Sequence, residues 1–443
     1  MEDKLLIVSC PFPIIGGGEE RSFQVLKLIK KYTYFDIEVI FPPDRIVDLL
    51  QIYCINDYDW KNIIKTLEKN RVPINQYSIM FLENGFGKQT KIGSFNISAF
   101  FDGLLPQRKI NFYKEYIRKC IEHCDSETFK GIYSHHEYLD AVYVSKYLSS
   151  KLNLDFVILL QLEPFRSFVD ATKSYFRFNR FDFRTLINFL PFMNLNTTIS
   201  KEYRDLLKSK HFKGFLSVSI TPILISGLTN TNYRVLRPAN AFESKLLKYR
   251  RNIRKKENYA VFFARFTPGK GIFELPIIWR IVTKEIPDIR LIVCGRQDQR
   301  FLGKFKNLTK KYDVEDKIIL KGYVPRDELF EIVSKAKVFV YPTHSDSFSL
   351  VTLESLAVGT PVIAYDIPAI KYTYRDINAV KIVREWNTRE MAKRVIDILK
   401  ISEDEYIEML NERKLINFLK LHSSWENVAK NEAKELENLL NFE

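Results

Sequence analysis

Short runs of apolar and β-branched residues alternate with helical patterns along the carboxyl half of the chain. Strands that are apolar throughout, rather than at every second residue, are typical of a parallel sheet that helices cover on both faces. This half is therefore predicted to form a Rossmann-type α/β domain. Its predicted strands are residues 259–266, 290–294, 318–320, 338–341, 361–365 and 379–383.

The amino half repeats the same pattern with longer insertions and is predicted to be a second α/β domain. Its predicted strands are residues 5–9, 37–41, 132–134, 156–160 and 197–199. The pattern changes near residues 234–240, so we expect one domain over 1–235 and another over 236–420. A basic stretch before the first strand of the second domain, residues 245–256, is interpreted as the solvated face of a helix.

Charge and cysteine content narrow the class of protein. The 68 Lys and Arg residues outnumber the 54 Asp and Glu residues, and the net charge of +14 favours an anionic partner such as a phosphate, nucleic acid or an acidic membrane face. Five cysteines in 443 residues form no small disulfide framework, which favours a reducing, cytoplasmic setting. The first apolar run, residues 5–10, is too short for a signal peptide, and no run approaches the ~18–20 apolar residues of a membrane span. Any membrane contact is therefore expected to be peripheral.

The strongest chemical signal is a pair of acids, Asp346 and Glu354, eight positions apart. The first follows a predicted strand and the second lies inside the next predicted helix. The small residues Ser347 and Ser349 leave the backbone N–H groups at the start of this helix open, and the positive end of a helix dipole suits a diphosphate. Glu354, about one turn into the helix, is placed to accept the hydroxyls of a ribose.

This segment resembles the signature of family 4 glycosyltransferases, which are retaining enzymes of the GT-B fold. The usual form is an acid, Gly-Phe-Gly, four residues, Glu, and then Gly-x-Pro-Val. Asp346 stands where Glu is usual, and Ser347 and Ser349 replace the two glycines. The matching positions are Asp346, Phe348, Leu350, Glu354, Gly359, Pro361 and Val362. The resemblance implies two Rossmann-like domains that face each other across a cleft.

A second motif of the family precedes this one in the chain. Arg265 and Lys270 follow a predicted strand and flank a Pro-Gly turn, so both cations can meet at the carboxyl end of that strand. In enzymes with this pattern the two cations grip the leaving diphosphate, and the pattern of Arg, four residues and Lys-Gly is intact here. An Arg and a Lys on a loop would otherwise be an ordinary solvated pair.

Three further resemblances extend over almost the whole chain. Gly17 and Gly18 lie in a glycine loop like the one that approaches donor and acceptor in the family. Tyr323 and Val324 resemble the turn whose backbone reads the nucleotide base. Trp425 resembles a residue of the terminal helix that crosses back to the first domain, so residues 421–443 are expected to form that helix.

Two adjacent histidines end a predicted strand of the amino-terminal domain. His135 and His136 are expected to face the cleft, although either could instead be a hydrogen-bonded structural histidine. In many relatives a histidine also ends the next strand. Gln161 occupies that position here.

Two apparent metal sites are set aside. Cys120, His123 and Cys124 lie within five residues, but a zinc site would need a fourth ligand at a plausible spacing. Asp57 and Asp59 resemble the acid pair of the other glycosyltransferase fold, but they precede a helical run and capping is the favoured role. No metal is predicted.

A stripe of basic residues follows the fourth predicted strand. On a single helix its members would fall within about 60° of one another, among aromatic residues, as in a helix that lies on an anionic bilayer. The alternative is a helix whose aromatic face is buried and whose arginines face water. The members are Arg166, Lys173, Arg177, Arg180 and Arg184.

Together these features predict a retaining hexosyltransferase that moves a sugar from a nucleoside diphosphate sugar to a hydroxyl of a glycan or lipid-linked acceptor. It is expected to use no metal or other cofactor and to act in the cytoplasm, peripherally at the inner membrane face. The predicted catalytic residues are Arg265, Lys270, Asp346 and His135. The predicted substrate-binding residues are Gly17, Gly18, His136, Gln161, Tyr323, Val324, Ser347, Phe348, Ser349, Leu350, Val351 and Glu354.

Two other classes of function remain as alternatives. A sugar-nucleotide epimerase or a phosphorylase of the same fold would share the diphosphate grip. A basic nucleic-acid-binding protein would fit the charge, but it should carry aromatic stacking platforms or groove-reading helices, and the sequence has no such motif.

Overall fold

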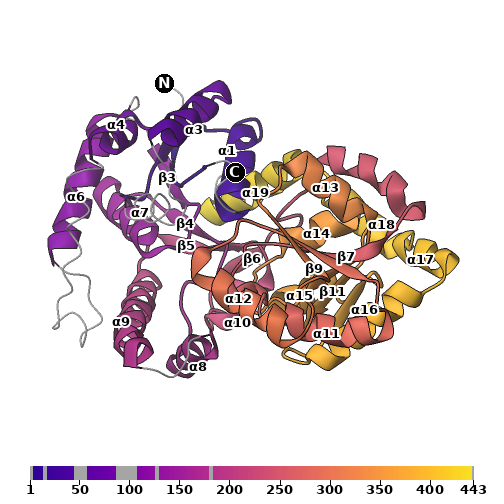
Figure 1. Cartoon of the computed structure of the whole chain (residues 1–443). Coiled ribbons are helices and arrows are strands. Elements are labelled where there is room, and N and C mark those ends of the chain that lie inside the picture. Colours follow the sequence, from indigo (N-terminus) through magenta and orange to yellow (C-terminus); the bar gives the residue numbers. More distant parts are fainter. Residues whose placement is uncertain are drawn as a thin grey trace. The chain divides into compact units, whose positions relative to one another are not determined.

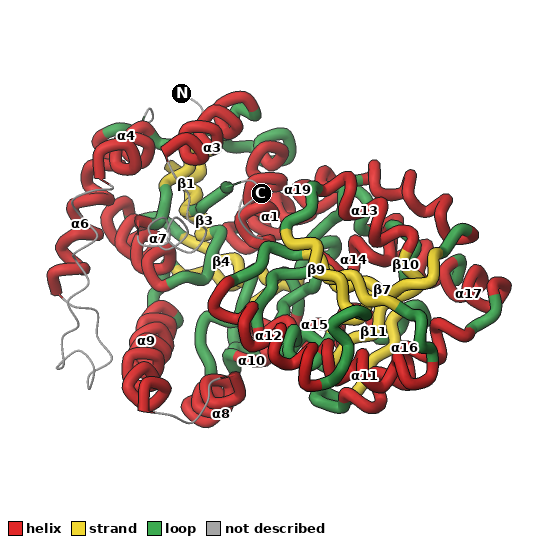
Figure 2. Tube along the Cα trace, viewed as in Figure 1, coloured by secondary structure: helices red, strands yellow, loops and turns green. Residues whose placement is uncertain are grey.

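The fold is taken from a computed structural model of the chain, which describes residues 3–12, 17–43, 57–85, 107–124, 129–178 and 183–441. The chain divides into two compact units. The amino-terminal unit contains Met1–Ala239 together with Trp425–Glu443, and the carboxyl-terminal unit contains Asn240–Ser424 (Figure 1). In both units strands are enclosed by helices (Figure 2).

The amino-terminal unit contains, in its described residues, a six-stranded parallel sheet in the order β2-β1-β3-β4-β5-β6. Every residue of the central strand β4, with the sequence FVILL, is buried, as expected of a sheet covered on both faces. The strands are β1 (Lys4–Val8), β2 (Asp36–Ile40), β3 (Phe129–Ser134), β4 (Phe156–Leu160), β5 (Phe212–Ser217) and β6 (Tyr233–Val235).

Helices from both ends of the sequence belong to this unit. The last helix, α19, packs against α1, β4 and β5. The helices are α1 (Gly17–Ile29), α3 (Asp57–Lys69), α4 (Gln76–Gly85), α6 (Gln107–Glu122), α7 (Leu139–Leu152), α8 (Phe168–Phe178), α9 (Phe183–Leu206), α10 (Ile220–Ile225) and α19 (Trp425–Leu440).

The carboxyl-terminal unit contains a second six-stranded parallel sheet, in the order β12-β11-β10-β7-β8-β9. This is the doubly wound order in which the direction of strand progression reverses between the first and the fourth strand, here β7 and β10. The strands are β7 (Glu257–Phe263), β8 (Arg290–Cys294), β9 (Ile318–Gly322), β10 (Ala336–Tyr341), β11 (Val362–Tyr365) and β12 (Val380–Val383).

Helices flank this sheet and bury a continuous apolar core (Figure 1). The 3₁₀ segments are η1 (Ser244–Arg254) and η2 (Pro268–Lys270). The helices are α11 (Leu275–Glu285), α12 (Gln299–Lys311), α13 (Arg326–Lys335), α14 (Leu350–Ala357), α15 (Pro368–Tyr374), α16 (Thr388–Lys400), α17 (Glu403–Leu410) and α18 (Arg413–Leu421).

One predicted strand is wrong. Residues 197–199 lie inside α9, where Thr198, Tyr203 and Leu206 are buried at helical spacing. The fifth strand is instead β5, a run that Lys213 and Gly214 interrupt. Gly214 has φ +145°, and a Cβ there would lie 2.6 Å from the carbonyl oxygen of Asn232, so close contact with the next segment requires the glycine.

The basic stretch at 245–256 is not simply solvated, which corrects its interpretation. The Lys256 ammonium is largely buried and donates to the carbonyl oxygens of Ser334 at 2.6 Å and Gly359 at 2.7 Å. Arg250 donates to the carbonyl oxygen of Leu356 at 2.9 Å. Both cations are thus hydrogen-bonded to backbone carbonyl groups of the carboxyl-terminal unit.

The basic stripe does not lie on one helix, which corrects a second expectation. Helix α8 ends at Phe178 and α9 begins at Phe183. The two helices pack against each other through aromatic rings such as Tyr175 and Phe189, whose centroids are 5.3 Å apart, and one continuous helix could not make this contact. Arg166 precedes α8, Lys173 and Arg177 lie on α8, and Arg184 lies on α9, whereas Arg180 lies outside the described residues.

Candidate functional site

The two predicted motifs of the carboxyl-terminal unit meet where the strand order of its sheet reverses. Ligands of doubly wound folds bind at the carboxyl ends of the strands at this point. The loop after β7 and the loop after β10 touch, because the N–H of His344 donates to the carbonyl oxygen of Gly269 at 2.9 Å. A Cβ at Gly271, where φ is +76°, would lie 2.0 Å from the carbonyl oxygen of Pro342. The glycine of the Lys-Gly pair is therefore required by the close approach of two backbones.

Lys270 and Asp346 form an ion pair at this junction. The Lys270 ammonium lies 3.0 Å from Asp346 Oδ2 and donates to the carbonyl oxygen of Ser345 at 2.8 Å. The hydroxyl of Tyr341 donates to the same carboxylate oxygen at 2.7 Å. Burial lowers the pKa of Lys270, although Asp346 opposes this shift, and the nearby charge of Arg265 lowers the pKa further. Because Arg265 itself is exposed, it can reach a ligand.

The start of α14 is held in an unusual backbone conformation. Ser349, which precedes the helix, has φ +67° and ψ +71°, the left-handed region that favours glycine. Its carbonyl oxygen accepts from the hydroxyl of Tyr374 at 2.9 Å, and its Oγ is 2.8 Å from Thr352 Oγ1. Leu350 and Val351 are the first two residues of the helix, so their N–H groups have no partner within it. These two N–H groups are suited to an anionic ligand.

Two other residues of the acid motif are buried. Ser347 is 4% exposed, and Phe348 packs its ring against Tyr374 and His422, with centroid distances of 6.0 Å and 5.4 Å. The Phe348 side chain therefore anchors the loop to the core. Any contact of Phe348 with a ligand would be made by its backbone.

Glu354 has a partner that the sequence did not reveal. Arg326, the first residue of α13, donates to Glu354 Oε1 at 2.9 Å. The Glu354 side chain is largely buried and that of Arg326 is half exposed. The turn before α13 presents Tyr323 to solvent, at 69% exposure, and buries Val324. The Tyr323 ring is thus accessible to a planar ligand.

Residues at the carboxyl ends of β3 and β4 meet the glycine loop in the amino-terminal unit. Gly17 is the first residue of α1, and a Cβ at Gly18 would lie 3.0 Å from Gln161 Oε1. His136 Nε2 accepts from the N–H of Cys10 at 3.1 Å. The structure thus brings together Gly18, Gln161 and His136, three of the predicted substrate-binding residues.

Gln161 is held by contacts that the sequence did not reveal. Its side-chain amide donates to the carbonyl oxygen of His135 at 2.8 Å and to Ser22 Oγ at 3.1 Å. Its backbone N–H donates to Glu137 Oε2 at 2.9 Å. The orientation of Gln161 is therefore well defined.

His135 lies instead in a buried cluster with α19. Its Nε2 is 2.7 Å from Glu432 Oε1, which also accepts from the hydroxyl of Tyr133 at 2.8 Å. Arg21 forms an ion pair with the other oxygen of Glu432, and all four side chains are buried. Burial opposes ionisation of Glu432, but the charges of Arg21 and His135 lower its pKa to about 2. The catalytic role of His135 stays a prediction, and the visible role of its ring is to bind α19.

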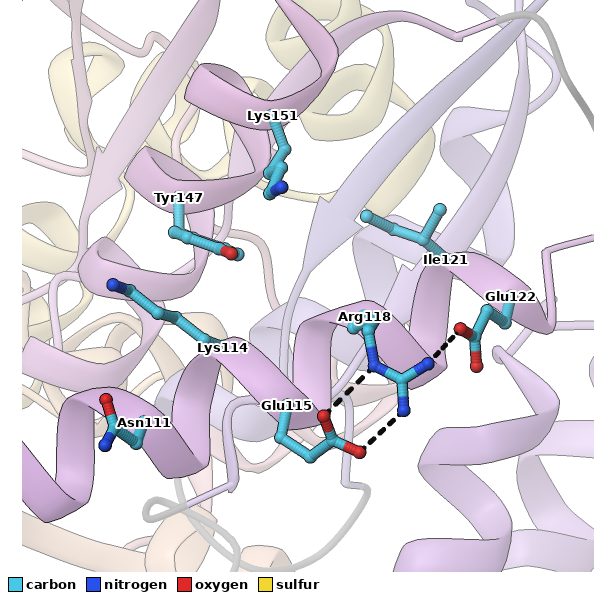
Figure 3. Close-up of a pocket in the computed structure, with 8 residues that line it drawn as sticks. All are labelled: Asn111, Lys114, Glu115, Arg118, Ile121, Glu122, Tyr147 and Lys151. Atoms are coloured by element: carbon cyan, nitrogen blue, oxygen red, sulfur yellow. Dashed lines mark hydrogen bonds and ion pairs between the residues drawn. The ribbon is translucent and has the colours of Figure 1, made fainter.

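A groove of about 420 Å³ lies apart from all predicted site residues (Figure 3). It is lined by residues of α6 and α7, and Arg118 pairs with Glu115 and Glu122 on its own helix, α6 (Figure 3). The arginine is thus already neutralised by two carboxylates. The lining residues are Asn111, Lys114, Glu115, Arg118, Ile121, Glu122, Tyr147 and Lys151.

The two rejected metal sites can be located in part. His123 Nδ1 is 2.8 Å from the carbonyl oxygen of Lys119. The Cys124 thiol donates to the carbonyl oxygen of Cys120 at 3.2 Å. Helix α3 begins at Asp57. Within the described ranges, no group of three His, Cys, Asp or Glu residues could hold a metal ion, and no helix is long and apolar enough to cross a membrane.

Comparison with known proteins connects these features to a family. Residues 244–414 match the model of the glycosyl transferases group 1. Over 132 residues the chain is 28% identical to the alpha-monoglucosyldiacylglycerol synthase of Streptococcus pneumoniae, a match that covers 30% of each chain. Matches to this and two other curated relatives span 22% to 41% of those proteins, well under two thirds of their length.

Similarity to solved structures extends over the whole chain. The sucrose-phosphate synthase of Thermosynechococcus elongatus has a TM-score of 0.64 at 14% identity and covers 99% of both chains. The Anabaena protein HepE in complex with UDP-glucose has a TM-score of 0.54 at 12% identity and covers 99% of this chain and 96% of that one. At such low identity these likenesses establish the fold alone. The chain therefore has the GT-B fold, and its carboxyl-terminal unit contains the segment that matches the model of the glycosyl transferases group 1.

Proposed function

We propose that this protein is a retaining glycosyltransferase that moves a hexose from a nucleoside diphosphate sugar to a hydroxyl group of a glycan or lipid-linked acceptor. The observation that carries the proposal is the pairing of Lys270 with Asp346 at 3.0 Å where the strand order reverses, beside the exposed Arg265. A buried cation and an exposed one at this position suit an anion of two phosphates. The group 1 family match covers both motifs, which further supports the proposal.

The donor diphosphate is proposed to be bound by three kinds of positive group. Arg265 and Lys270 supply positive charge. The N–H groups of Leu350 and Val351, at the positive end of the α14 dipole, supply hydrogen-bond donors. As the bond to the sugar breaks, negative charge grows on the leaving oxygen, and preorganised donors stabilise it by roughly 3 to 4 kcal/mol each. These groups would do the work that a divalent metal does in other transferases. Transfer is therefore proposed to proceed without metal.

The other predicted residues divide between the sugar and the nucleoside. Asp346 is proposed to accept a hydrogen bond from a hydroxyl of the donor sugar. The hydroxyl of Tyr341 and the ammonium of Lys270 hold its carboxylate in place. Glu354 is proposed to accept the ribose hydroxyls in exchange for its contact with Arg326. The exposed ring of Tyr323 is proposed to cover the base. The acceptor hydroxyl would attack from the face that the diphosphate leaves, which retains the anomeric configuration.

A lipid-linked acceptor and a peripheral position on the inner membrane face are proposed from the surface of α8 and α9. Ile187, Leu190 and Leu195 are each more than half exposed and recur at helical spacing along α9. Phe168 near the start of α8 is 68% exposed, and Lys173 on the same helix is also exposed. Apolar side chains beside cations are the combination that binds an anionic bilayer surface. One relative of the matched segment is named as a synthase of a glucosyl lipid.

A panel of nucleotide sugars tests the proposal. A UDP-, GDP- or ADP-sugar should raise the melting temperature of the protein, because a ligand that binds only the folded state stabilises it. The sugar donor identified in this way should then be consumed in the presence of an acceptor and EDTA. Binding without transfer, with release of an altered nucleotide sugar, would indicate an epimerase. Absorbance of bound pyridoxal phosphate would indicate a phosphorylase.

A further inference from the structure

His344 occupies a position between the two predicted motifs that neither of them explains. It lies in the loop after β10, two residues before Asp346, and it is only 7% exposed. Its backbone N–H donates to Gly269 in the loop that carries Lys270. Its ring therefore lies where a contact can set the position of both loops.

Both ring nitrogens of His344 face carboxylate oxygens. Nδ1 lies 2.7 Å from Glu385 Oε1, in the segment after β12, and Nε2 lies 3.2 Å from Glu274 Oε1, at the start of α11. A neutral imidazole has one N–H and can donate to only one carboxylate, whereas an imidazolium donates to both. With both carboxylates ionised, both contacts are hydrogen bonds only when the ring is charged.

The surroundings of the ring favour the same form. The ring of Trp386 stacks on His344 with a centroid distance of 3.8 Å, and the ring of Tyr365 at the end of β11 lies 5.2 Å away. Burial alone would lower the pKa of His344, but the hydrogen bonds to Glu274 and Glu385 outweigh it and raise the pKa. Tyr365 stays neutral, because burial and these two carboxylates raise its pKa.

We propose that His344 is a positioning residue: as an imidazolium held between Glu274 and Glu385, it fixes the loop after β10 so that Asp346 meets Lys270. This inference rests on the proposed function, since it assigns to His344 the task of preorganising the donor site. Loss of the second proton leaves a ring nitrogen and a carboxylate oxygen facing each other without a hydrogen atom between them. The loop then loses one of its two charged anchors.

Titration of His344 tests the charged state without any ligand. The ring resonances of the six histidines are followed by NMR in protein labelled at histidine, and the His344 signal is identified by its loss in His344→Gln. His344 should titrate above the usual value of about 6.5. Glu385→Gln should lower this value, and Glu274→Gln should do the same. A His344 pKa at or below the usual value, or one that neither variant lowers, overturns the proposal.

Binding of UDP-glucose tests the positioning role. This probe suits the experiment because its diphosphate, esterified at both ends, does not change charge between about pH 6 and about pH 9. Its affinity for the unaltered protein should fall on the order of tenfold as His344 loses its proton. His344→Gln should bind with the weaker affinity throughout and lack this step. At higher pH Lys270, whose pKa burial lowers, also loses its proton, and the fall in affinity that follows should remain in both proteins.

Variants and controls separate the possible failures. His211→Gln is the matched control, because His211 contacts a single carboxylate, that of Asp155, at 3.3 Å in the other unit, and the step should persist. If His344→Gln does not fold, Glu385→Gln, a change at a partly exposed position, should move the step to lower pH. A step that is unchanged in both variants overturns the positioning role. Failure of the unaltered protein to bind any nucleotide sugar of the panel would instead count against the proposed function. The NMR titration alone would then test whether His344 is held as an imidazolium between Glu274 and Glu385.

Discussion

The ammonium of Lys270 lies 3.0 Å from Asp346 Oδ2, although the two residues come from loops that follow different strands. Parallel strands β7 and β10 are neighbours in the sheet, so their carboxyl ends deliver both loops to one place. The pair holds a buried cation ready beside an exposed one, Arg265. This relationship leads to the first prediction, and the neighbouring contacts lead to the others.

Removal of either cation should impair transfer. Arg265→Ala or Lys270→Ala should lower turnover by roughly two to three orders of magnitude, because each removes a preorganised positive group from the leaving diphosphate. EDTA should leave the unaltered rate unchanged. Lys335→Ala is the control, since this exposed lysine lies just before β10, at the amino end of that strand and away from the site at its carboxyl end, and pairs with Glu331. Activity that disappears with EDTA and returns with manganese would contradict the prediction.

Neutralising Glu354 should weaken nucleotide binding. Glu354→Gln retains the volume but removes a charged acceptor for the ribose hydroxyls, which should cost roughly 1.5 to 3 kcal/mol of binding free energy. Calorimetry with the nucleotide sugar that binds most tightly measures this loss of binding free energy. Arg326→Gln is the comparison, because Arg326 contacts Glu354 and should have a smaller effect. Equal affinity of Glu354→Gln and the unaltered protein would remove Glu354 from the site.

Replacing Ser349 with glycine should stabilise the carboxyl-terminal unit. Ser349 has φ +67°, which is strained for any residue with a Cβ, so glycine should raise the free energy of unfolding by up to about 1 kcal/mol. Ser349→Ala should lower it, because alanine keeps the strain and, like glycine, loses the 2.8 Å contact with Thr352. Denaturant unfolding measures both variants. Equal stability of Ser349→Gly and Ser349→Ala would contradict the strain at this position.

The buried pair of Arg21 and Glu432 should dominate the stability of the amino-terminal unit. Glu432→Gln should lower the free energy of unfolding by about 3 to 5 kcal/mol, because it leaves a buried guanidinium without its charge partner. Glu435→Gln on the same helix should cost at most about 1 kcal/mol, since its pair with Arg234 is partly exposed. Similar losses in the two variants would contradict a special role for the buried pair.

The same pair predicts an acid transition. The pKa of Glu432 is lowered to about 2 in the folded protein, below the ordinary 4.5 of the unfolded chain. A lowered carboxyl pKa stabilises the fold above the unfolded value, and this stability is lost as the pH falls from 4.5 towards 2. The contribution of His344 to stability depends on pH in the opposite direction. Its raised pKa stabilises the fold below its ordinary 6.5, and that contribution disappears as the pH rises through the folded value. Unfolding measured across this pH range in Glu432→Gln and His344→Gln separates the two contributions.

Membrane contact through α8 and α9 should depend on both charge and apolar side chains. Each basic residue near an anionic surface contributes about 1 kcal/mol, so reversing Arg177 and Arg180 to Glu should release the protein from acidic vesicles, and salt should weaken binding. Ile187→Ser with Leu190→Ser should weaken binding even at low salt. The control reverses Arg300 and Lys304 on α12 in the other unit. Equal sedimentation of all variants would favour a soluble acceptor.

The local pattern of the sequence was enough to predict most of the fold. Continuous apolar runs such as β4 identified the buried parallel strands, because burial on both faces excludes polar residues from every position. The pattern failed at β5, where Lys213 and Gly214 interrupt the run, and at 197–199, where a short β-branched segment belongs to α9. Those positions are decided by packing against neighbours that local periodicity does not record.

For the candidate site, too, local sequence was enough to predict some features and not others. Sequence alone determined the two motifs and their spacing, because a loop that follows a strand and a helix that follows a loop are local features. Only the tertiary structure decided which side chains meet: Arg326 with Glu354, His344 with two carboxylates, and Glu432 with Arg21 across 411 residues of sequence. It also assigned His135 a contact with α19. Partners of buried charged groups come from distant segments, because a charge removed from water must be compensated by whatever group the packing of the whole chain brings next to it.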